Sequence, residues 1–550
     1  MKRTRAGLAG FLTLLLTASL LGACGGGGDS SSGPTQTGGG GTSPPPTAAT
    51  DILTYKNDVS RTGQNLTESV LTLANVNSTG FGLLRFLAAD GKVDAQPLYL
   101  SGLTVNGATH NVVYVATEND SVYAYDADSG TLLWQVSLLG SGEAPSDPVY
   151  GCSQVTPEIG VTSTPVIDRA AGAHGTLFVV AMSRTTSTAT YHQRLHALDV
   201  TTGAELLNGP MDISATYPVA GGSMTFDPAA YEERAALLLS QGTIYTSWTS
   251  HCDIAPYSGW VITYSEATLA KTAVFNAAPN SGGGGPAIWM AGGGPAADAA
   301  GNVYLLTANG AFETTLNSSG FPSQSDYGNS FLKLTLSGSS LTVADYFAMF
   351  NEVDESSADE DLGSGGILLL PDLTDSGGTT RHLAVGAGKD GNLYVVNRDS
   401  MGKFNSGANN IWQQLSGVLG GGIWSTPAYF AQTVYYGPSN GHLLAFTLSD
   451  AELSAATQSA ASFTYPGTAP AVSANGAANG IVWAHENANP AVLHAYDAGN
   501  LAHELYNSSQ AANGRDQFGA GNKFITPAIA DGKVFVGATN GVAVFGLLGN

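Results

Sequence analysis

The side chains best suited to chemistry gather around one cysteine. The segment SWTSHCDIAPYSGW places His251, Asp253, Tyr257 and Trp260 around Cys252. Histidine and aspartate can move protons or hold a metal ion, while aromatic side chains offer flat surfaces to a ligand. A loop histidine bonded to nearby backbone is the commoner arrangement. We therefore expect a binding loop here, and keep His251 as a catalytic base or metal ligand as the alternative.

Cys152 and Cys252 are the only cysteines beyond the N-terminal region. Two cysteines in an exported protein pair more often than they stay free, so we predict a disulfide between them. Two separate buried thiols are the alternative. A disulfide would bring the loop around His251 beside the segment CSQVTPEIG, which carries Glu158.

Residues 1–23 predict export from the cytoplasm. Lys2, Arg3 and Arg5 precede an apolar run from Leu8 to Leu21, a pattern typical of a secretory signal peptide. The run ends in LGAC, which resembles the lipobox of bacterial lipoproteins and implies cleavage before Cys24 and lipidation of that residue. An ordinary signal peptide followed by a chance cysteine is the alternative. Residues 24–50 are rich in Gly, Ser, Thr and Pro, which predicts a flexible tether.

Composition excludes several classes of function. The 550 residues carry 43 acidic and 20 basic side chains, a net charge of −23, and no basic cluster follows residue 5. Such a chain repels phosphate backbones, so no nucleic-acid partner is expected. No internal stretch approaches 18 apolar residues, so no transmembrane helix is expected in the mature chain. We find no convincing serine nucleophile elbow, P-loop, dinucleotide fingerprint or CxxCH haem motif in the sequence.

A repeat organises the chain from residue 90 onward. Its clearest copy, VVYVATENDSVYAYDADSGTLLWQVSLL (112–139), contains three runs with a period of two, separated by turn-forming clusters. A proline followed by apolar residues marks seven copies, and residues 237–264 form an eighth copy without it. The prolines are Pro97, Pro165, Pro295, Pro371, Pro427, Pro470 and Pro527. Four-stranded blades with loop insertions suit these spacings, so we predict an all-β, eight-bladed β-propeller over residues 51–550.

The last repeat reaches the C-terminus with only three strand patterns. The segment GFGLLRFLA (80–88), which precedes the first repeat, can supply the missing strand. Pairing the two ends of the domain in this way removes the exposed strand edges of a linear array. We therefore predict that the last blade is closed by an N-terminal strand.

Two segments resemble the repeats of the pyrroloquinoline quinone (PQQ) propeller superfamily: YVATENDSVYAYDADSGTLLW and GKDGNLYVVNRDSMG. The similarity spans roughly residues 75–550. That superfamily includes calcium- and PQQ-dependent alcohol dehydrogenases, and also lipid-anchored propellers without cofactor that serve in outer-membrane protein assembly. The whole chain is similar to exported bacterial PQQ-like proteins of undefined activity. Such a repeat is strong evidence for fold and weak evidence for chemistry.

The resemblance assigns roles to four residues if the chain is a dehydrogenase. Asn309, in VYLLTANGAF, takes the position of a calcium-ligating asparagine, whose amide oxygen suits a hard cation. Asp361 takes the position of the general base, and Lys389 that of the cation beside the quinone. Trp289 is an approximate equivalent of the tryptophan that stacks on the quinone, about three residues out of register.

The sequence departs from the dehydrogenase pattern in two ways. The calcium-ligating glutamate has no counterpart in SRTTSTATYHQRLHALD, and the adjacent Cys-Cys pair is missing. Ordinary structural roles also compete at the assigned positions. Asn309-Gly310 suits a hairpin turn, Lys389-Asp390-Gly391 suits a common turn, and Asp361 lies in an acidic stretch typical of a solvated loop.

Two functions follow from these observations. The first is a binding or assembly module, lipid-anchored at Cys24 in the cell envelope, that holds a protein or glycan partner with its loops. The alternative is a PQQ- and calcium-dependent dehydrogenase that oxidises alcohols or sugars. We expect a monomer whose only membrane contact is the lipid. Gly25 replaces the Asp that usually marks inner-membrane retention, which favours the outer membrane.

Overall fold

A computed structural model describes residues 50–549. The predicted signal peptide, the lipidation of Cys24 and nearly all of the predicted tether lie outside these residues. None of the helices in the described part is long and apolar enough to cross a membrane.

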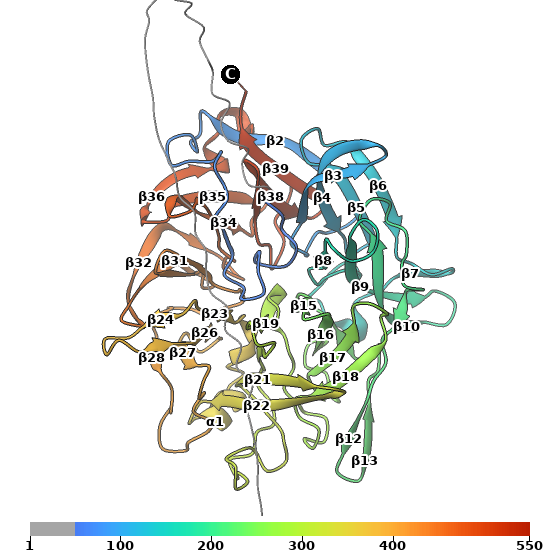
Figure 1. The fold of residues 1–550 in the computed structure, drawn as a ribbon, viewed down its shortest axis with the longest axis vertical. Coiled ribbons are helices and arrows are strands. Elements are labelled where there is room, and N and C mark those ends of the chain that lie inside the picture. Colours follow the sequence, from blue (N-terminus) through green and yellow to red (C-terminus); the bar gives the residue numbers. More distant parts are fainter. Residues whose placement is uncertain (1–49, 550) are drawn as a thin grey trace, which may run out of the picture. The chain divides into compact units, whose positions relative to one another are not determined.

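Eight sheets, each built on four antiparallel strands, surround a central axis in the described residues (Figure 1). This arrangement confirms the predicted eight-bladed β-propeller. From the axis outward, the first four blades are: blade 1, β3 (Leu98–Val105), β4 (Ala108–Ala116), β5 (Ser121–Asp126) and β6 (Leu132–Ser137); blade 2, β8 (Val166–Asp168), β9 (Thr176–Thr185), β10 (Thr190–Asp199) and β11 (Met211–Asp212); blade 3, β15 (Leu238–Ser240), β16 (Thr243–Ser250), β17 (Trp260–Ser265) and β18 (Lys271–Asn276); blade 4, β19 (Ala296–Ala297), β20 (Val303–Leu306), β21 (Ser330–Ser337) and β22 (Ser340–Ala348).

The other four blades repeat the pattern, and are: blade 5, β23 (Leu368–Leu369), β26 (Leu383–Ala387), β27 (Leu393–Asn397) and β28 (Gln413–Leu415); blade 6, β29 (Ala428–Phe430), β30 (Thr433–Tyr436), β31 (Gly441–Ser449) and β32 (Glu452–Phe463); blade 7, β33 (Ala471–Asn475), β34 (Ala478–Glu486), β35 (Val492–Asp497) and β36 (Asn500–Asn507); blade 8, β37 (Ala528–Ala530), β38 (Lys533–Ala538), β39 (Gly541–Leu547) and β2 (Phe81–Ala88).

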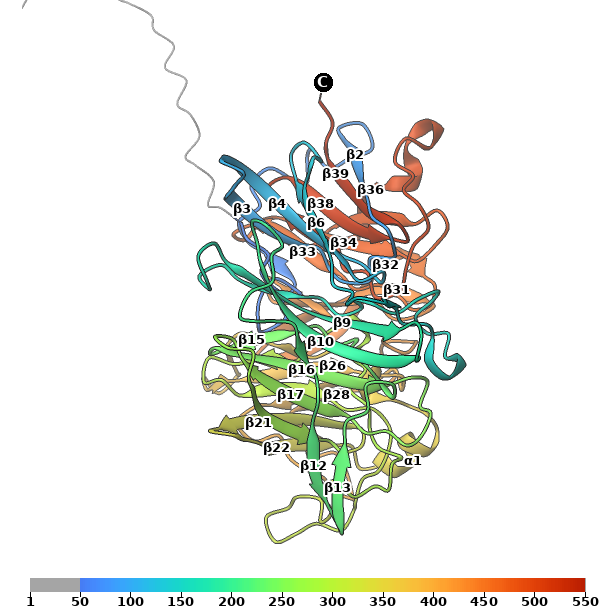
Figure 2. The same cartoon turned by 90° about the vertical axis from the view of Figure 1, so that its right-hand side faces the viewer.

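Short elements decorate this ring. The helix α1 (Glu352–Ser357) follows blade 4, and a β-hairpin that precedes blade 3 projects from the body (Figure 2). The remaining strands are β1 (Gln64–Asn65), β7 (Glu143–Pro145), the hairpin strands β12 (Thr216–Val219) and β13 (Gly222–Thr225), β14 (Tyr231–Glu232), β24 (Leu373–Thr374) and β25 (Thr380–Arg381). Five single 3-10 turns lie at Val149–Gly151, Met290–Gly292, Leu362–Ser364, Ser508–Gln510 and Ala512–Gly514.

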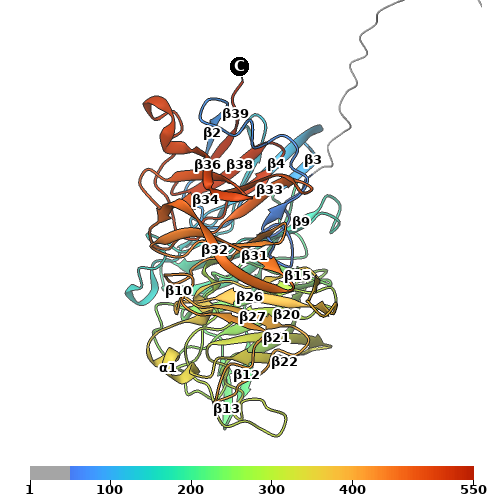
Figure 3. The same cartoon turned by 90° about the vertical axis from the view of Figure 1, so that its left-hand side faces the viewer.

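Blade 8 joins the two ends of the domain, as predicted. β2 pairs antiparallel with β39, from Phe81 opposite Leu547 to Ala88 opposite Gly541, and Figure 3 shows the two strands side by side. Phe81 is fully buried, and its ring lies 4.9 Å from that of Tyr506 in blade 7. This N-terminal strand therefore completes the sheet of blade 8 and also packs blade 8 against blade 7.

Prolines mark the starts of the innermost strands in six blades. Pro97, for example, directly precedes β3, where its missing N–H removes no hydrogen bond from the sheet. Pro371 is the exception, because it follows β23 instead of preceding it. Our assignment of Pro371 as the anchor of its repeat was therefore wrong. In blade 5 the residue at the anchor position is Ile367.

Residues 51–68, which we call the axial segment, run through the centre of the ring and contact every blade (Figure 1). Their backbone groups and side chains bond residues in or directly before the innermost strands. The partners, from blade 1 to blade 8, are Tyr99, Ile167, Leu237, Ala297, Leu369, Tyr429, Val472 and Ile529. The segment thus fills the axis and ties all eight blades together. The sequence pattern places these residues in the domain but does not predict this role.

Two basic residues of the axial segment are fully buried. Arg61 donates to the carbonyls of Pro295 at 2.9 Å and Leu237 at 3.1 Å, and burial lowers its pKa to about 10. The amine of Lys56 donates to the carbonyl of Pro470. Burial lowers the pKa of Lys56 to about 7. Both cations are held mainly by backbone carbonyls of the blades.

Candidate functional site

A pocket lies where the loops between blades converge on the axis. Seven of the eight interblade loops line it, together with the β16–β17 loop of blade 3 and the β26–β27 loop of blade 5. Its volume is about 110 Å³. The lining residues are Gln154, Arg234, Cys252, Asp253, Trp289, Ala291, Asp361, Ser364, Lys389, Trp424, Tyr465 and Phe524. The pocket therefore combines aromatic walls with charged groups from distant parts of the sequence.

Residues that were singled out separately in the sequence meet here. Asp361, Lys389 and Trp289 line the pocket, as do Asp253 and Cys252. Asn309 lies next to them, because its backbone N–H donates to Asp361 Oδ1 at 2.8 Å. The resemblance to the dehydrogenases thus pointed to positions that the fold brings together. It does not by itself give these residues the roles that their counterparts have in the dehydrogenases.

Asp361 and Lys389 form an ion pair at the wall of the pocket. The Lys389 amine lies 2.6 Å from Asp361 Oδ2 and 3.0 Å from Oδ2 of the exposed Asp359. Burial raises the pKa of Asp361, and the neighbouring Lys389 and the N–H of Asn309 oppose that rise. Burial disfavours the charged Lys389, but the two carboxylates outweigh it and raise the pKa of Lys389.

Arg234 covers the face of Trp289, with its guanidinium carbon 4.7 Å from the ring centroid. Its Nε and Nη2 donate to the two oxygens of Glu232 at 3.1 and 3.2 Å. Burial alone would raise the pKa of Glu232, but Arg234 and His251 outweigh it and lower that pKa to about 2. Sequence reasoning missed Arg234. The available signal in the sequence was position, because Arg234 lies shortly before the innermost strand of blade 3, whose repeat lacks the proline.

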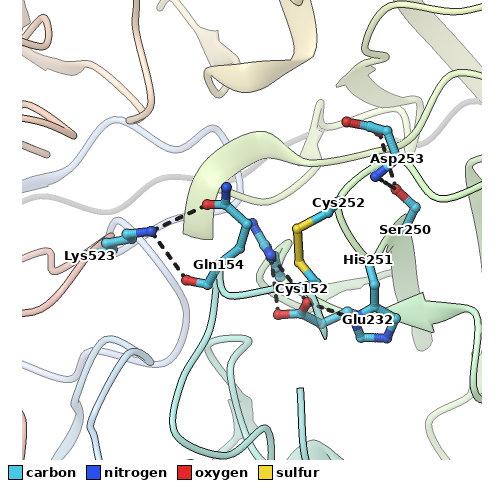
Figure 4. Close-up of a disulfide and its surroundings, with 9 residues drawn as sticks. Cys152, Gln154, Glu232, Ser250, His251, Cys252, Asp253 and Lys523 are labelled. Carbon is cyan, nitrogen blue, oxygen red and sulfur yellow. Dashed lines mark hydrogen bonds and ion pairs between the residues drawn. A yellow bond between two sulfur atoms is a disulfide. The ribbon is translucent and has the colours of Figure 1, made fainter. Parts of the chain in front are cut away.

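The disulfide between Cys152 and Cys252 is present, as predicted, with their Cα atoms 5.6 Å apart. It joins the loop before blade 2 to the β16–β17 loop of blade 3 (Figure 4). Gln154 and Asp253, two residues and one residue beyond these cysteines, line the pocket. The disulfide therefore fixes two walls of the pocket to each other.

The predicted binding loop around Cys252 is only partly exposed. Asp253 lines the pocket, and burial raises its pKa. Tyr257, His251 and Trp260 are all buried, with exposed fractions of 8%, 1% and 0%. Trp260 begins β17, and its ring lies 6.0 Å from that of Phe226. The role of these four side chains as a binding loop stays a prediction.

Aromatic residues of three other loops were missed. Trp424 and Phe524 each lie three residues before a proline that starts an innermost strand, and Tyr465 lies five residues before another. Trp424 and Tyr465 contact each other edge to face, with centroids 5.3 Å apart. An aromatic residue shortly before the repeat proline was the signal in the sequence. This signal is easily missed, because the loops that carry these aromatic residues show no periodic pattern.

The arrangement does not fit the calcium and quinone of the dehydrogenases. In the described residues no group of three or more His, Cys, Asp or Glu side chains is placed to hold a metal ion. The Asp361 carboxylate contacts the Lys389 amine, and the Asn309 side-chain amide donates to Asp359 at 2.8 Å. Arg234 occupies one ring face of Trp289. Asp361 and the face of Trp289 are thus already engaged by protein cations, although the resemblance itself expects Lys389 beside a quinone.

The fold and its axial pocket define an eight-bladed β-propeller with a ligand-sized cavity at its loop face. The family model of the outer membrane protein assembly factor BamB matches residues 61–293. No curated protein matches the sequence. The family match covers less than half of the chain and agrees with the resemblance to PQQ-like propeller repeats.

Solved structures with the same fold include two quinohemoprotein alcohol dehydrogenases. The enzyme from Comamonas testosteroni is 14% identical with a TM-score of 0.60, and the match covers 91% of this chain and 81% of that one. The enzyme ADHIIG from Pseudomonas putida HK5 is 13% identical with the same TM-score and coverages. A europium-containing methanol dehydrogenase is 14% identical with a TM-score of 0.53, covering 90% of this chain and 98% of that one. These likenesses show the fold and leave the chemistry open.

Proposed function

We propose that this chain is a binding module of the cell envelope that holds a glycan in its axial pocket. The pocket itself carries the proposal, because loops from seven blade junctions bring aromatic and charged side chains together at one concave site. Sites of this kind bind small ligands, with aromatic walls for contact and a few polar groups for orientation. The acid that would act as base in a dehydrogenase is already paired with Lys389.

A glycan suits the pocket better than a protein partner does. About 110 Å³ has room for one ring-sized group but not for the wide surface that a stable protein interface buries. Trp424 and the 38% exposed Tyr465 offer ring faces against which a sugar can stack. The signal peptide and the lipobox-like LGAC support export and anchoring at Cys24, and therefore display in the envelope.

A glycan array tests this function directly. The full chain with Cys24→Ser, produced without lipid, should bind a subset of bacterial envelope glycans. Trp424→Ala should weaken that binding roughly tenfold, as expected for the loss of an aromatic contact. Trp412→Ala, on the outer part of blade 5 and away from the pocket, is the matched control. If Trp424→Ala binds the same glycans as strongly as the parent, the pocket is not the site.

A second candidate is the PQQ- and calcium-dependent dehydrogenase. It is supported by the convergence of Asp361, Lys389 and Trp289 in one pocket and by the fold shared with quinohemoprotein alcohol dehydrogenases. Arg234 covers one face of Trp289, and no group of three His, Cys, Asp or Glu side chains in the described residues is placed to hold calcium. For these two reasons we rank this candidate second.

A further inference from the structure

One wall of the pocket carries a cation with a free donor. Arg234 is only 4% exposed, and its Nε and Nη2 are used by Glu232. Nη1 makes no hydrogen bond within residues 50–549, and it is not among their buried unpartnered atoms. A guanidinium nitrogen held in this way by a buried carboxylate is a preorganised donor. Arg234 can therefore donate to a ligand without giving up Glu232.

A second cation approaches the same wall from the loop before blade 8. The Lys523 amine is 3.3 Å from both the backbone and the side-chain oxygens of Gln154, and Figure 4 shows the two residues facing each other. The same amine is 5.4 Å from the ring centroid of Tyr465. It has no ion-pair partner among the described carboxylates. Burial lowers the pKa of Lys523, and the positive charges of Arg234 and Lys92 lower it further. The charges of Arg234 and Lys523 therefore repel each other, while the carboxylates of Asp94 and Glu232 oppose the fall in the pKa of Lys523.

Several acids lie near these cations. Glu232 balances Arg234. Asp94 and Glu118 interact with each other, and burial raises the pKa of both. Asp94 also accepts a bond from Asn522, which precedes Lys523 in the chain. Asp253 and Asp361 line the pocket as well, so this wall is distinguished by two cationic donors that no described carboxylate occupies, Arg234 Nη1 and the Lys523 amine.

We propose that the axial pocket selects an anionic sugar, whose carboxylate or phosphate group binds between Arg234 and Lys523. This inference rests on the proposed glycan-binding function and adds the class of glycan. The anion accepts hydrogen bonds from Arg234 Nη1 and from the Lys523 amine, and relieves the repulsion between the two cations. The sugar ring lies toward Trp424 and Tyr465, beside the Lys523 amine.

The test compares matched glycans on one protein. Isothermal titration of the full chain with Cys24→Ser uses the best-bound glycan from the array in its neutral form, with one uronate in place of a hexose, and with one phosphate on the ring. The uronate or the phosphate form should bind at least about tenfold more tightly than the neutral form, as charge-assisted hydrogen bonds predict. Its affinity should fall as sodium chloride rises from about 50 to 500 mM. Which of the two forms binds more tightly identifies the anion.

Lys523→Gln is the diagnostic variant, because Lys523 is partly exposed and holds no ion pair in the described structure. It should weaken the anionic glycan about tenfold and leave the neutral glycan unchanged, whereas Lys271→Gln, on the outer edge of blade 3, should change neither. The inference is overturned if the neutral and anionic forms bind with equal affinity, or if Lys523→Gln binds the anionic glycan as tightly as the parent. In either case the proposed function still stands as long as glycan binding depends on Trp424. If no glycan of any class binds, both fail.

Discussion

At the scale of single residues, the ion pair between Asp361 and Lys389 is stabilising only while both partners are present. Lys389→Met would leave a carboxylate that is 4% exposed without its counter-charge. The free energy of unfolding should fall by about 1–3 kcal/mol at neutral pH, the cost of a buried polar group left without its partner. This is less than the roughly 3–5 kcal/mol for a fully buried ion pair, because the Lys389 side chain is 20% exposed. Denaturant unfolding of the variant beside Lys271→Met measures the difference.

The pH dependence of this variant separates charge from packing. Without Lys389, burial raises the pKa of Asp361 in the folded chain further above that of the unfolded chain. The folded chain then holds a proton that the unfolded chain has released, so its stability falls as pH rises above about 4. The deficit of Lys389→Met should therefore be small near pH 4 and largest at neutral pH. If Lys389→Met is destabilised equally at pH 4 and at neutral pH, the loss of packing is the cause and the loss of charge is not.

The burial of Lys56 predicts a second dependence of stability on pH, which arises from a buried amine with a lowered pKa. The amine releases its proton near pH 10.5 when exposed and near 7 in the folded chain, because burial lowers its pKa to about 7. Between these values the unfolded chain binds more protons, so the free energy of unfolding should rise with pH. Below pH 7 the buried ammonium costs the folded state up to about 5 kcal/mol.

Lys56→Met tests this assignment, since methionine fills similar space without a charge. The variant should be more stable than the parent at pH 7, and its stability should rise less between pH 7 and about 10. Unfolding in guanidinium at several pH values is the measurement, with Lys271→Met as the control for loss of an exposed lysine. Parallel pH profiles for parent and Lys56→Met would contradict the assignment.

At the scale of elements, the disulfide fixes two loops of the pocket across a sequence separation of 100. The double variant Cys152→Ser/Cys252→Ser should lose about 2–5 kcal/mol of unfolding free energy, the usual range for a native disulfide. We also expect weaker glycan binding, because Gln154 and Asp253 lose their mutual constraint. Calorimetric unfolding and titration of the same sample check both effects. An unchanged affinity would show that the loops hold their positions without the bond.

The strands were predictable and the pocket largely was not, for physical reasons. Period-two runs between turn clusters define blades because each strand buries one face, so β4 and β5 follow directly from residues 112–126. Pro371 misled the assignment because a proline can follow a short strand as readily as precede one. Loop residues such as Arg234 and Trp424 carry no periodicity. Asp361, Lys389 and Trp289 were found only through the resemblance to the dehydrogenases.

The axial segment escaped prediction for a related reason. Residues 51–68 bond the innermost strands mainly through their backbone, and contacts of that kind leave little trace in side-chain pattern. Arg61 and Lys56 resemble exposed charges in the sequence, yet both are fully buried. Their burial depends on carbonyls from distant blades, and no local pattern reports such contacts.

At the scale of the whole molecule, closure by β2 keeps the edge of β39 covered. A chain that begins at residue 90 lacks both β2 and the axial segment, and should self-associate through that edge. Size-exclusion chromatography should show oligomers, whereas a chain that begins at residue 50 should stay monomeric. If the chain without residues 1–89 stays monomeric and unfolds at the same midpoint, closure by β2 is dispensable.

Our central proposal is that the axial pocket binds a ligand without oxidising it, because Arg234 covers one face of Trp289 and no metal-ligating group of His, Cys, Asp or Glu side chains stands in the described residues. The most direct test incubates the full chain with Cys24→Ser with PQQ and calcium, desalts it, and records the quinone absorbance and dye reduction with alcohols and sugars. We predict that the absorbance is lost on desalting and that no dye is reduced. Retention of one equivalent of quinone, with dye reduction that disappears in Asp361→Asn, would contradict the claim.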